Sequence, residues 1–213
     1  MPSSAEILAG LTRIANEWMA TAVLWHIVLA CMFYALVKDI WRPSARTAAL
    51  AASGPLASAA AFAWVGQNPF NGLVLSLATI ALGVLAYRLG TAPLQLGKLH
   101  ARQLGAGLIL FGWLYPHFLE ARSIWVYTFA SPIGLVPCPS LSIMIGLGLY
   151  SDEFGSRAWG LTAGALGLFY GIVGVARLGV WIDIPLVIGA AYIAVSSARR
   201  PHRISTQPGA LLP

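Results

Sequence analysis

The sequence predicts an all-α integral membrane protein with about seven transmembrane helices, and three observations lead to this. Of its 213 residues, 58% are hydrophobic and only 9% are charged, whereas soluble domains carry about 25% charged residues. The mean hydropathy is +0.76. Apolar stretches long enough to cross a bilayer alternate with short segments rich in charge, proline or glycine. We therefore expect residues 1–213 to form a single transmembrane domain, without a separate soluble one.

Residues 3–16 precede the first span and have the pattern of a short amphipathic helix. Ser3 and Glu6 have the spacing of a capping box, and apolar residues recur at helical spacing after them. Two interpretations stay open: an interfacial helix lying on the membrane, or an extension of the first spanning helix. The start of the chain lacks the basic residues of a signal peptide, so we expect the first apolar run to stay in the membrane.

The spans themselves are read from the apolar stretches and the breakers between them. A polar turn at residues 67–71 separates the second from the third, and residues 198–213 are predicted to be a disordered tail. The seven spans are expected at residues 18–37, 47–65, 72–87, 103–119, 127–150, 158–176 and 184–197.

The fifth span carries no charge but contains Pro132, Pro137 and Pro139. Proline removes a backbone donor and clashes with the preceding helical turn. We therefore expect this helix to be broken, with its hydrogen bonds interrupted around Cys138. Irregular backbone at membrane depth must be buried in protein or line a cavity, so the other spans are expected to pack around this one.

The charges between the spans predict the orientation. With seven spans, ten of the 13 Lys and Arg residues fall on one side and three on the other. An excess of Lys and Arg marks the cytoplasmic side. The sequence thus predicts a protein of the bacterial cytoplasmic (inner) membrane with its N-terminus outside and its C-terminus in the cytoplasm. Six spans, with residues 125–150 as a re-entrant loop, would instead put Arg157 outside. Because orientation explains the basic residues, we expect no nucleic-acid partner.

Cys138, between two prolines, is the most distinctive chemical feature of the sequence. Thiolates are the ligands that copper(I), zinc and similar soft ions prefer. Cys31 and Cys138 each lie about 13 residues into a span, which would place both near mid-depth, so one hypothesis is a metal site that they share. The alternative is that Cys138 is a small apolar filler at a helix break. Since both cysteines lie in apolar segments, a disulfide framework is not indicated.

Two histidines are candidates for cofactor binding. His26 lies inside the first span, where an ionisable group is a functional candidate. His117 lies at the outer end of the fourth span, and a haem held by His26 and His117 is one hypothesis. The alternative for His26 is a neutral imidazole hydrogen-bonded to a neighbouring helix. Four charged residues near the outer span ends form either a polar mouth over the broken span or ordinary interface anchors: Glu120, Arg122, Arg177 and Asp183.

Five glycines in the sixth span recur at alternating intervals of four and three residues, which places them along one helix face. Such stripes of small residues let two helices approach closely. One interpretation is packing against the fifth or seventh span of the same chain. The other is a docking face for other membrane subunits. The glycines are Gly160, Gly164, Gly167, Gly171 and Gly174.

A local resemblance accompanies these motifs. Residues 133–140, Ile-Gly-Leu-Val-Pro-Cys-Pro-Ser, resemble the Gly-x-x-Pro-Cys-Pro signature of the nickel/cobalt exporter family, whose histidine-rich metal motif does not occur in this sequence. Over residues 115–150, Tyr115-Pro116 followed by Pro137-Cys138-Pro139 resembles an uncharacterised bacterial family of small polytopic membrane proteins with a domain of unknown function. That second resemblance implies no activity.

Two functions are compatible with these features. The first is a transporter-like protein for a small solute or soft metal ion that passes Cys138, because discontinuous helices near mid-membrane are typical of transport sites. The second is an accessory or assembly subunit of a larger membrane complex, without catalytic residues of its own. The sequence contains no catalytic triad, phosphate loop, HExxH or CxxC pair, which argues against an enzyme. It does not identify a cofactor, and the lipid bilayer is the one partner that it requires.

Overall fold

The computed structural model describes residues 3–121 and 123–200, and this part of the chain is built from helices joined by short connections. Five of its helices are long and apolar enough to cross a membrane. The prediction of an all-α membrane protein is thereby confirmed. The five candidate spans are Met19–Leu36, Ala45–Val65, Pro69–Tyr87, Arg157–Arg177 and Trp181–Ala198.

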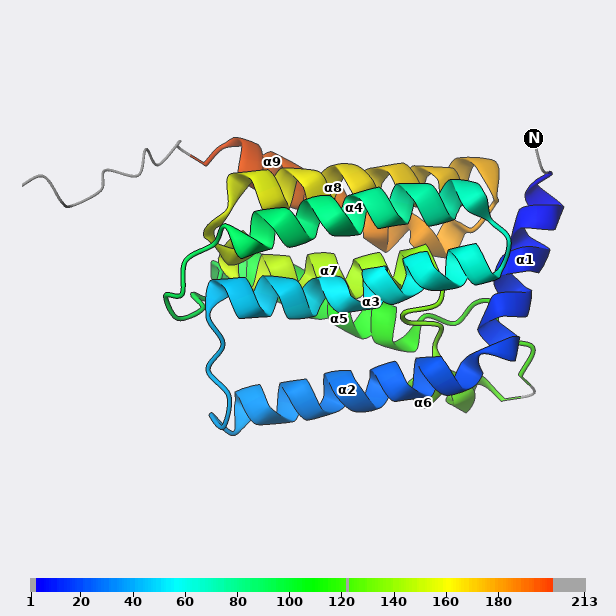
Figure 1. The fold of residues 1–213 in the computed structure, drawn as a ribbon, viewed down its shortest axis with the longest axis horizontal. Helices are drawn as coiled ribbons and strands as arrows, with labels where there is room; N and C mark the ends of the chain where they lie inside the picture. The colour runs from blue at the N-terminus through cyan, green and yellow to red at the C-terminus, as the bar shows by residue number, and fades with distance from the viewer. Residues whose placement is uncertain (1–2, 122, 201–213) are drawn as a thin grey trace, which may run out of the picture.

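The long helices lie side by side, while the first helix crosses one end of the bundle (Figure 1). Successive long helices run in opposite directions, with connections at alternate ends. The elements are α1 (Ser4–Glu17), α2 (Met19–Val37), α3 (Ala45–Val65), α4 (Pro69–Tyr87), α5 (Leu99–Leu114), η1 (Ile124–Val126), α6 (Tyr127–Ala130), α7 (Pro137–Tyr150), η2 (Asp152–Gly155), α8 (Arg157–Ile172), η3 (Val173–Arg177), η4 (Trp181–Asp183) and α9 (Ile184–Ala198).

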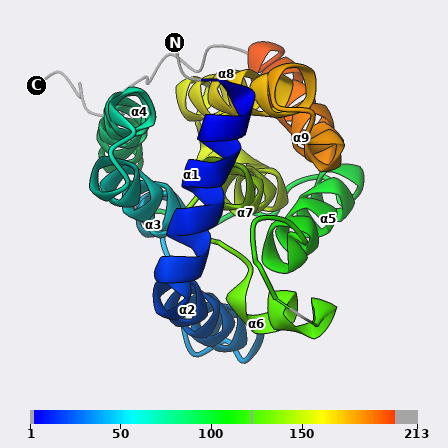
Figure 2. The ribbon, with the colours of Figure 1, turned by 90° about the vertical axis from the view of Figure 1, so that its right-hand side faces the viewer.

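Helix α7 is the core of the bundle. It packs against α3, α5, α8 and α9, and Figure 2 shows it at the centre of the end-on view. Of its 14 residues, all but Cys138 and Tyr150 are buried. At 1.5 Å per residue it is about 21 Å long, shorter than the ~30 Å hydrocarbon core of a bilayer. The other helices therefore surround a short helix that contacts protein on every side.

The break in this segment lies before Cys138, so the expectation that the prolines interrupt a helix around the thiol is wrong. Residues 131–136 are not helical, and α7 begins at Pro137. Pro137 and Pro139 occupy the first helical turn, where backbone N–H groups have no partner within the helix and a missing donor costs little. The two prolines therefore start a helix, while Pro132 lies in the break itself.

Serine side chains form hydrogen bonds with backbone groups in and around the buried non-helical segment, residues 131–136. The Ser131 hydroxyl donates to the Gly112 carbonyl of α5 at 2.9 Å. The Ser140 hydroxyl accepts from the Gly134 N–H at 2.9 Å and donates to the Val136 carbonyl at 2.8 Å. Both serines are fully buried. These bonds meet the requirement that non-helical backbone at membrane depth find its partners within the protein.

Glycines bring α5 against α7 and α8 against α9. A Cβ atom on Gly105 would lie 2.6 Å from the Gly146 carbonyl oxygen, and one on Gly146 would lie 2.7 Å from the Gly105 carbonyl oxygen. On α8, a Cβ on Gly164 would lie 2.8 Å from Ala194 Cβ. The five-glycine stripe of α8 and η3 faces α9 and its N-terminal turn, as the internal interpretation expects.

Helix α1 begins with the predicted capping box and lies across the end of the bundle (Figure 2). The Ser3 N–H donates to the Glu6 carboxylate at 2.6 Å, and the Glu6 N–H donates to the Ser3 hydroxyl at 3.3 Å. The Ser4 hydroxyl donates to the Arg177 carbonyl, and the Asn16 amide donates to the Phe118 carbonyl, both at 2.9 Å. Helix α1 thus changes direction before α2 and is no straight extension of it.

The opposite end is closed by an acidic turn and the end of α9. Asp152, Glu153 and Phe154 adopt left-handed backbone angles, which place the nearly buried Glu153 carboxylate against Arg200. The Arg200 Nε donates to Glu153 at 2.6 Å and its Nη2 donates to the Asp152 carbonyl at 2.7 Å. Of the predicted disordered tail 198–213, Arg200 is therefore held in place, and residues 201–213 lie outside the described part.

Candidate functional site

A buried carboxylate, Asp183, joins three segments that are distant in the sequence. The Tyr115 hydroxyl donates to its Oδ1 at 2.7 Å. The Cys138 thiol donates to its Oδ2 at 3.2 Å. We call Tyr115, Cys138 and Asp183 the carboxylate cluster. It brings the residue after α5, the first turn of α7 and the residue before α9 to one point.

Local backbone features put each side chain in place. Tyr115 follows directly after α5 and precedes Pro116, which cannot continue the helix. Asp183 ends the short 3₁₀ turn η4, and Pro185 lies in the first turn of α9. Gly174 lies in η3, a turn of π-helix, where a Cβ would come within 2.1 Å of Asp183 Oδ2. The last glycine of the stripe therefore leaves room for the carboxylate, and π-turns occur frequently at functional sites.

Exposure differs among the three members. Tyr115 is 0% and Asp183 is 1% exposed, whereas Cys138 is partly exposed. A buried carboxylate without partners would be costly, and the phenol and thiol supply hydrogen bonds to both of its oxygens. Cys138 is therefore the one residue of the cluster with exposed surface.

The arrangement supplies soft and hard donor atoms beside each other. If the thiol loses its proton, the cluster presents a thiolate sulfur, carboxylate oxygens and a phenol oxygen. Soft cations such as copper(I) select the sulfur, and the carboxylate adds negative charge. Among residues 3–121 and 123–200, no group of three or more His, Cys, Asp and Glu side chains could hold a metal ion. The cluster therefore suits a singly charged soft ion better than a four-ligand zinc site.

The second predicted metal ligand, Cys31, is not beside the first. Cys31 is exposed on α2, while the Cys138 thiol is bonded to Asp183 in the interior. Counting residues along each span predicts the depth of a cysteine in the membrane, but it does not predict where around the bundle the side chain lies. The partner of Cys138 is a carboxylate from the start of α9.

His26 is buried and faces carbonyl oxygens through both ring nitrogens. Its Nδ1 lies 2.8 Å from the Ala22 oxygen of its own helix, and its Nε2 lies 3.2 Å from the Trp113 oxygen of α5. A neutral imidazole has one N–H and donates to one of the two. The ring would have to turn before either nitrogen could bind a haem iron. This placement agrees with the alternative in which His26 bonds a neighbouring helix.

His117 lies in different surroundings from His26. Its ring packs against Phe118, with 4.3 Å between centroids, and against Tyr115 at 6.5 Å. Partial burial lowers the pKa of its imidazole. His26 faces the Trp113 carbonyl and His117 packs against Phe118, so the two rings have different neighbours, and a haem held by both stays a prediction.

Sequence reasoning missed Tyr115 as a functional residue and placed Asp183 either in a polar mouth over the broken span or among interface anchors. Asp183 directly precedes the last apolar span, where an isolated carboxylate could have been read as a buried group. Its partners are 45 and 68 residues away in the sequence, so nothing local pairs them. Of the other anchors, Glu120 donates its backbone N–H to the Asn16 Oδ1, and Arg122 lies outside the described residues.

In comparisons with protein-family models, curated proteins and solved structures, nothing matched this chain. Its function is therefore argued from its own residues.

Proposed function

We propose that the chain is a transporter-like membrane protein whose carboxylate cluster binds a small soft cation, of the chemistry of copper(I) or silver(I). One observation carries the proposal: the thiol of a partly exposed cysteine is hydrogen-bonded to a buried carboxylate, at the start of a short helix inside the bundle. Binding would exchange the thiol proton for the cation, so the resulting thiolate would offset the cation's charge, with the Asp183 carboxylate beside it.

Two further features support transport. The segment from 127 to 150 is discontinuous, and discontinuous helices near mid-membrane are typical of transport sites. Ionisable groups inside membrane proteins commonly mark ion pathways, and Asp183 is such a group within a candidate span. Together these two features favour a path on which the transported ion binds to side chains inside the bundle.

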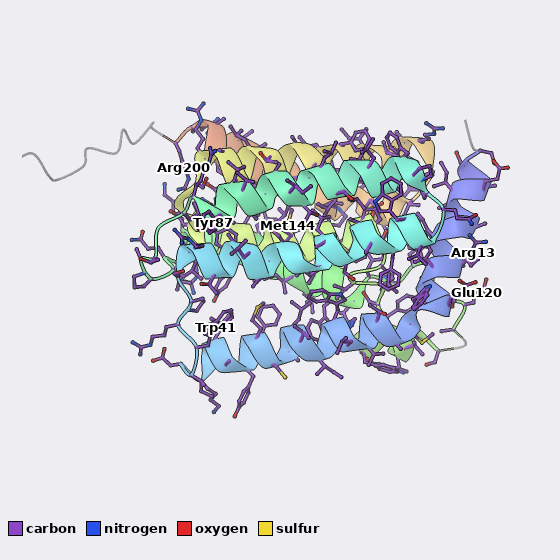
Figure 3. All side chains as sticks on the ribbon, viewed as in Figure 1. Arg13, Trp41, Tyr87, Glu120, Met144 and Arg200 are labelled. Atoms are coloured by element: carbon purple, nitrogen blue, oxygen red, sulfur yellow. The ribbon has the colours of Figure 1, made fainter. Side chains whose placement is uncertain are left out.

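We also propose seven passes, with α5 and the α6–α7 segment added to the five long helices. Hydrogen bonds between connections support this, because Ala45 N donates to Ala92 O and Gly97 N donates to Tyr150 O at one end, whereas α1 bonds Arg177 and Phe118 at the other. Figure 3 labels Trp41, Tyr87 and Arg200 near the first end and Arg13 and Glu120 near the second. The excess of Lys and Arg at the first end favours a cytoplasmic position there, in the bacterial inner membrane.

The orientation is tested with single cysteines introduced into a variant that lacks Cys31 and Cys138. Asn68→Cys and Ser123→Cys should react with a membrane-impermeant maleimide in intact cells, while Ser44→Cys should react only after lysis. Labelling of Ser44→Cys in intact cells would overturn the proposed orientation.

Ion transport is tested in proteoliposomes that contain a silver-sensitive dye. The wild type should admit silver(I), and Cys138→Ser should lose this flux because serine is a poor ligand for soft ions. Cys31→Ser is the matched control and should transport like the wild type. If the wild type neither binds nor admits silver(I), and purifies in mild detergent only with unrelated chains, the accessory-subunit function replaces transport.

A further inference from the structure

A cavity lies between α2 and the rest of the bundle. It has a volume of about 830 Å³, within the range of about 300–1,000 Å³ typical of ligand pockets. Its walls are mostly apolar, from Met32 and Phe33 of α2, Ile109 and Trp113 of α5 and Leu147 of α7. Side chains of α2 point into this space in Figure 3.

The cavity exists because α2 stands apart along most of its length. Only 17% of its span is buried, against 44% for the span of α3. Its contacts with α6 and with the connection to α1 hold it near one end. Apolar walls without an occupant lose dispersion contacts, and water gains little in a cavity with few polar partners. The interior therefore suits a hydrocarbon chain.

The mouth of the cavity carries charge and aromatic groups. Asp39, Trp41 and Arg42 line it where α2 ends. Arg42 forms an ion pair with Asp39, and both side chains are largely exposed. Tyr150, at the end of α7, lines the same cavity. Tryptophan and arginine at a membrane interface are typical contacts of lipid headgroups.

Arg102 does not line the cavity itself but lies over the ring of Tyr150, which does, and it supplies a cation with spare hydrogen-bonding capacity beside the mouth. Its guanidinium lies over the Tyr150 ring, 5.4 Å from the centroid, and its buried Nε has no hydrogen-bond partner among the described residues. Arg102 shares one face of α5 with three cavity-lining residues at helical spacing, Ala106, Ile109 and Trp113. The cationic group therefore lies above the apolar wall on the same helix face.

We infer that this cavity binds one acyl chain of an anionic phospholipid, whose phosphate contacts Arg102 and Arg42. Basic pockets between transmembrane helices recognise anionic headgroups in this way. The phosphate competes with Asp39 for Arg42, while Arg102 forms no ion pair with a carboxylate among residues 3–121 and 123–200. The lipid completes the packing of α2, and this site is separate from the carboxylate cluster.

Native mass spectrometry of the purified full chain tests the inference with two lipids of identical acyl chains, phosphatidylglycerol and phosphatidylcholine. The wild type should retain phosphatidylglycerol roughly fivefold better, in line with the net effect of one cation, Arg102, because Asp39 offsets the charge of Arg42. Arg102→Gln should remove this preference. Ala106→Phe should fill the cavity and lose both lipids, while Ala81→Phe, at an exposed position on α4, should behave like the wild type.

A phosphatidylglycerol with a photoreactive group in its acyl chain gives a second measurement. Its cross-links should fall on α2 and α5, and excess phosphatidylglycerol should compete better than phosphatidylcholine. Equal retention of both lipids by the wild type, or an Ala106→Phe variant that folds and keeps the cross-links, would overturn the inference. Neither result bears on silver transport, so the two proposals fail separately.

Discussion

Helices α9 and α2 are both long, apolar segments, but they meet the bundle in opposite ways. Their spans have mean hydropathies of 1.6 and 1.9. Helix α9 lies directly against α8 along the glycine stripe, whereas α2 stands beside a cavity and is only 17% buried. The sequence of α2 contains no glycine. Hydropathy therefore indicates that a helix enters the membrane, while the spacing of small residues decides how closely it packs.

The largest expected effect comes from a bulky side chain placed in the contact between α8 and α9, because it would remove the close packing that α2 lacks. In Gly167→Leu the new side chain starts 2.4 Å from Ile145 and 2.8 Å from Ala190, so it must force helices apart. We expect a loss of about 3 kcal/mol or more, at the upper end of overpacking effects. Thermal unfolding and size-exclusion chromatography in detergent measure it.

Gly107→Leu is the matched control, because a Cβ at Gly107 meets nothing within 4 Å. This variant should unfold near the wild-type temperature. If Gly167→Leu unfolds at the same temperature as Gly107→Leu, the close packing of α8 against its neighbours is refuted.

Two truncations sharpen the comparison. Ile193 of α9 is 0% exposed, and Ile193→Ala should cost about 2–5 kcal/mol, as for other buried large-to-small changes. Phe33 lines the cavity beside α2, and Phe33→Ala should cost less than about 1 kcal/mol in lipid-free detergent because its surroundings are already loose. Equal losses of unfolding free energy in the two variants would contradict the assignment of α2 as the loosely packed helix.

The carboxylate cluster lies where the stripe ends, and its loss should have an effect of intermediate size. Asp183→Ala removes the acceptor of two buried donors and should cost about 1–3 kcal/mol. Asp183→Asn keeps the shape and an acceptor oxygen, so it should cost less. In Asp183→Ala the Cys138 thiol should react faster with maleimide, since its hydrogen bond to the carboxylate is lost. Asp183→Asn keeps one acceptor oxygen and should change this reactivity less. If the reaction rate with maleimide is unchanged, the hydrogen bond from Cys138 to Asp183 does not limit the reactivity of the thiol.

The fold class, the α1 capping box and the packing role of the α8 stripe were predictable, because each depends on local composition or spacing. The start of α7 was not, because proline breaks a helix interior but favours a first turn, and the sequence does not show which position Pro137 occupies. The Gly105–Gly146 contact joins single glycines that form no stripe. The carboxylate cluster depends on tertiary contacts that bring Asp183 to Cys138 across 45 residues.

The burial of α7 on all sides has a consequence for hydrogen exchange. Amide protons in a helix without a free face exchange chiefly when the whole bundle opens, whereas loosely packed helices exchange through local opening. Pro137 and Pro139 contribute no amide proton, so the signal of α7 comes from its later turns. The exchange rate of residues 141–149 thus reports the global stability of the protein, and that of α2 reports how firmly its cavity is filled.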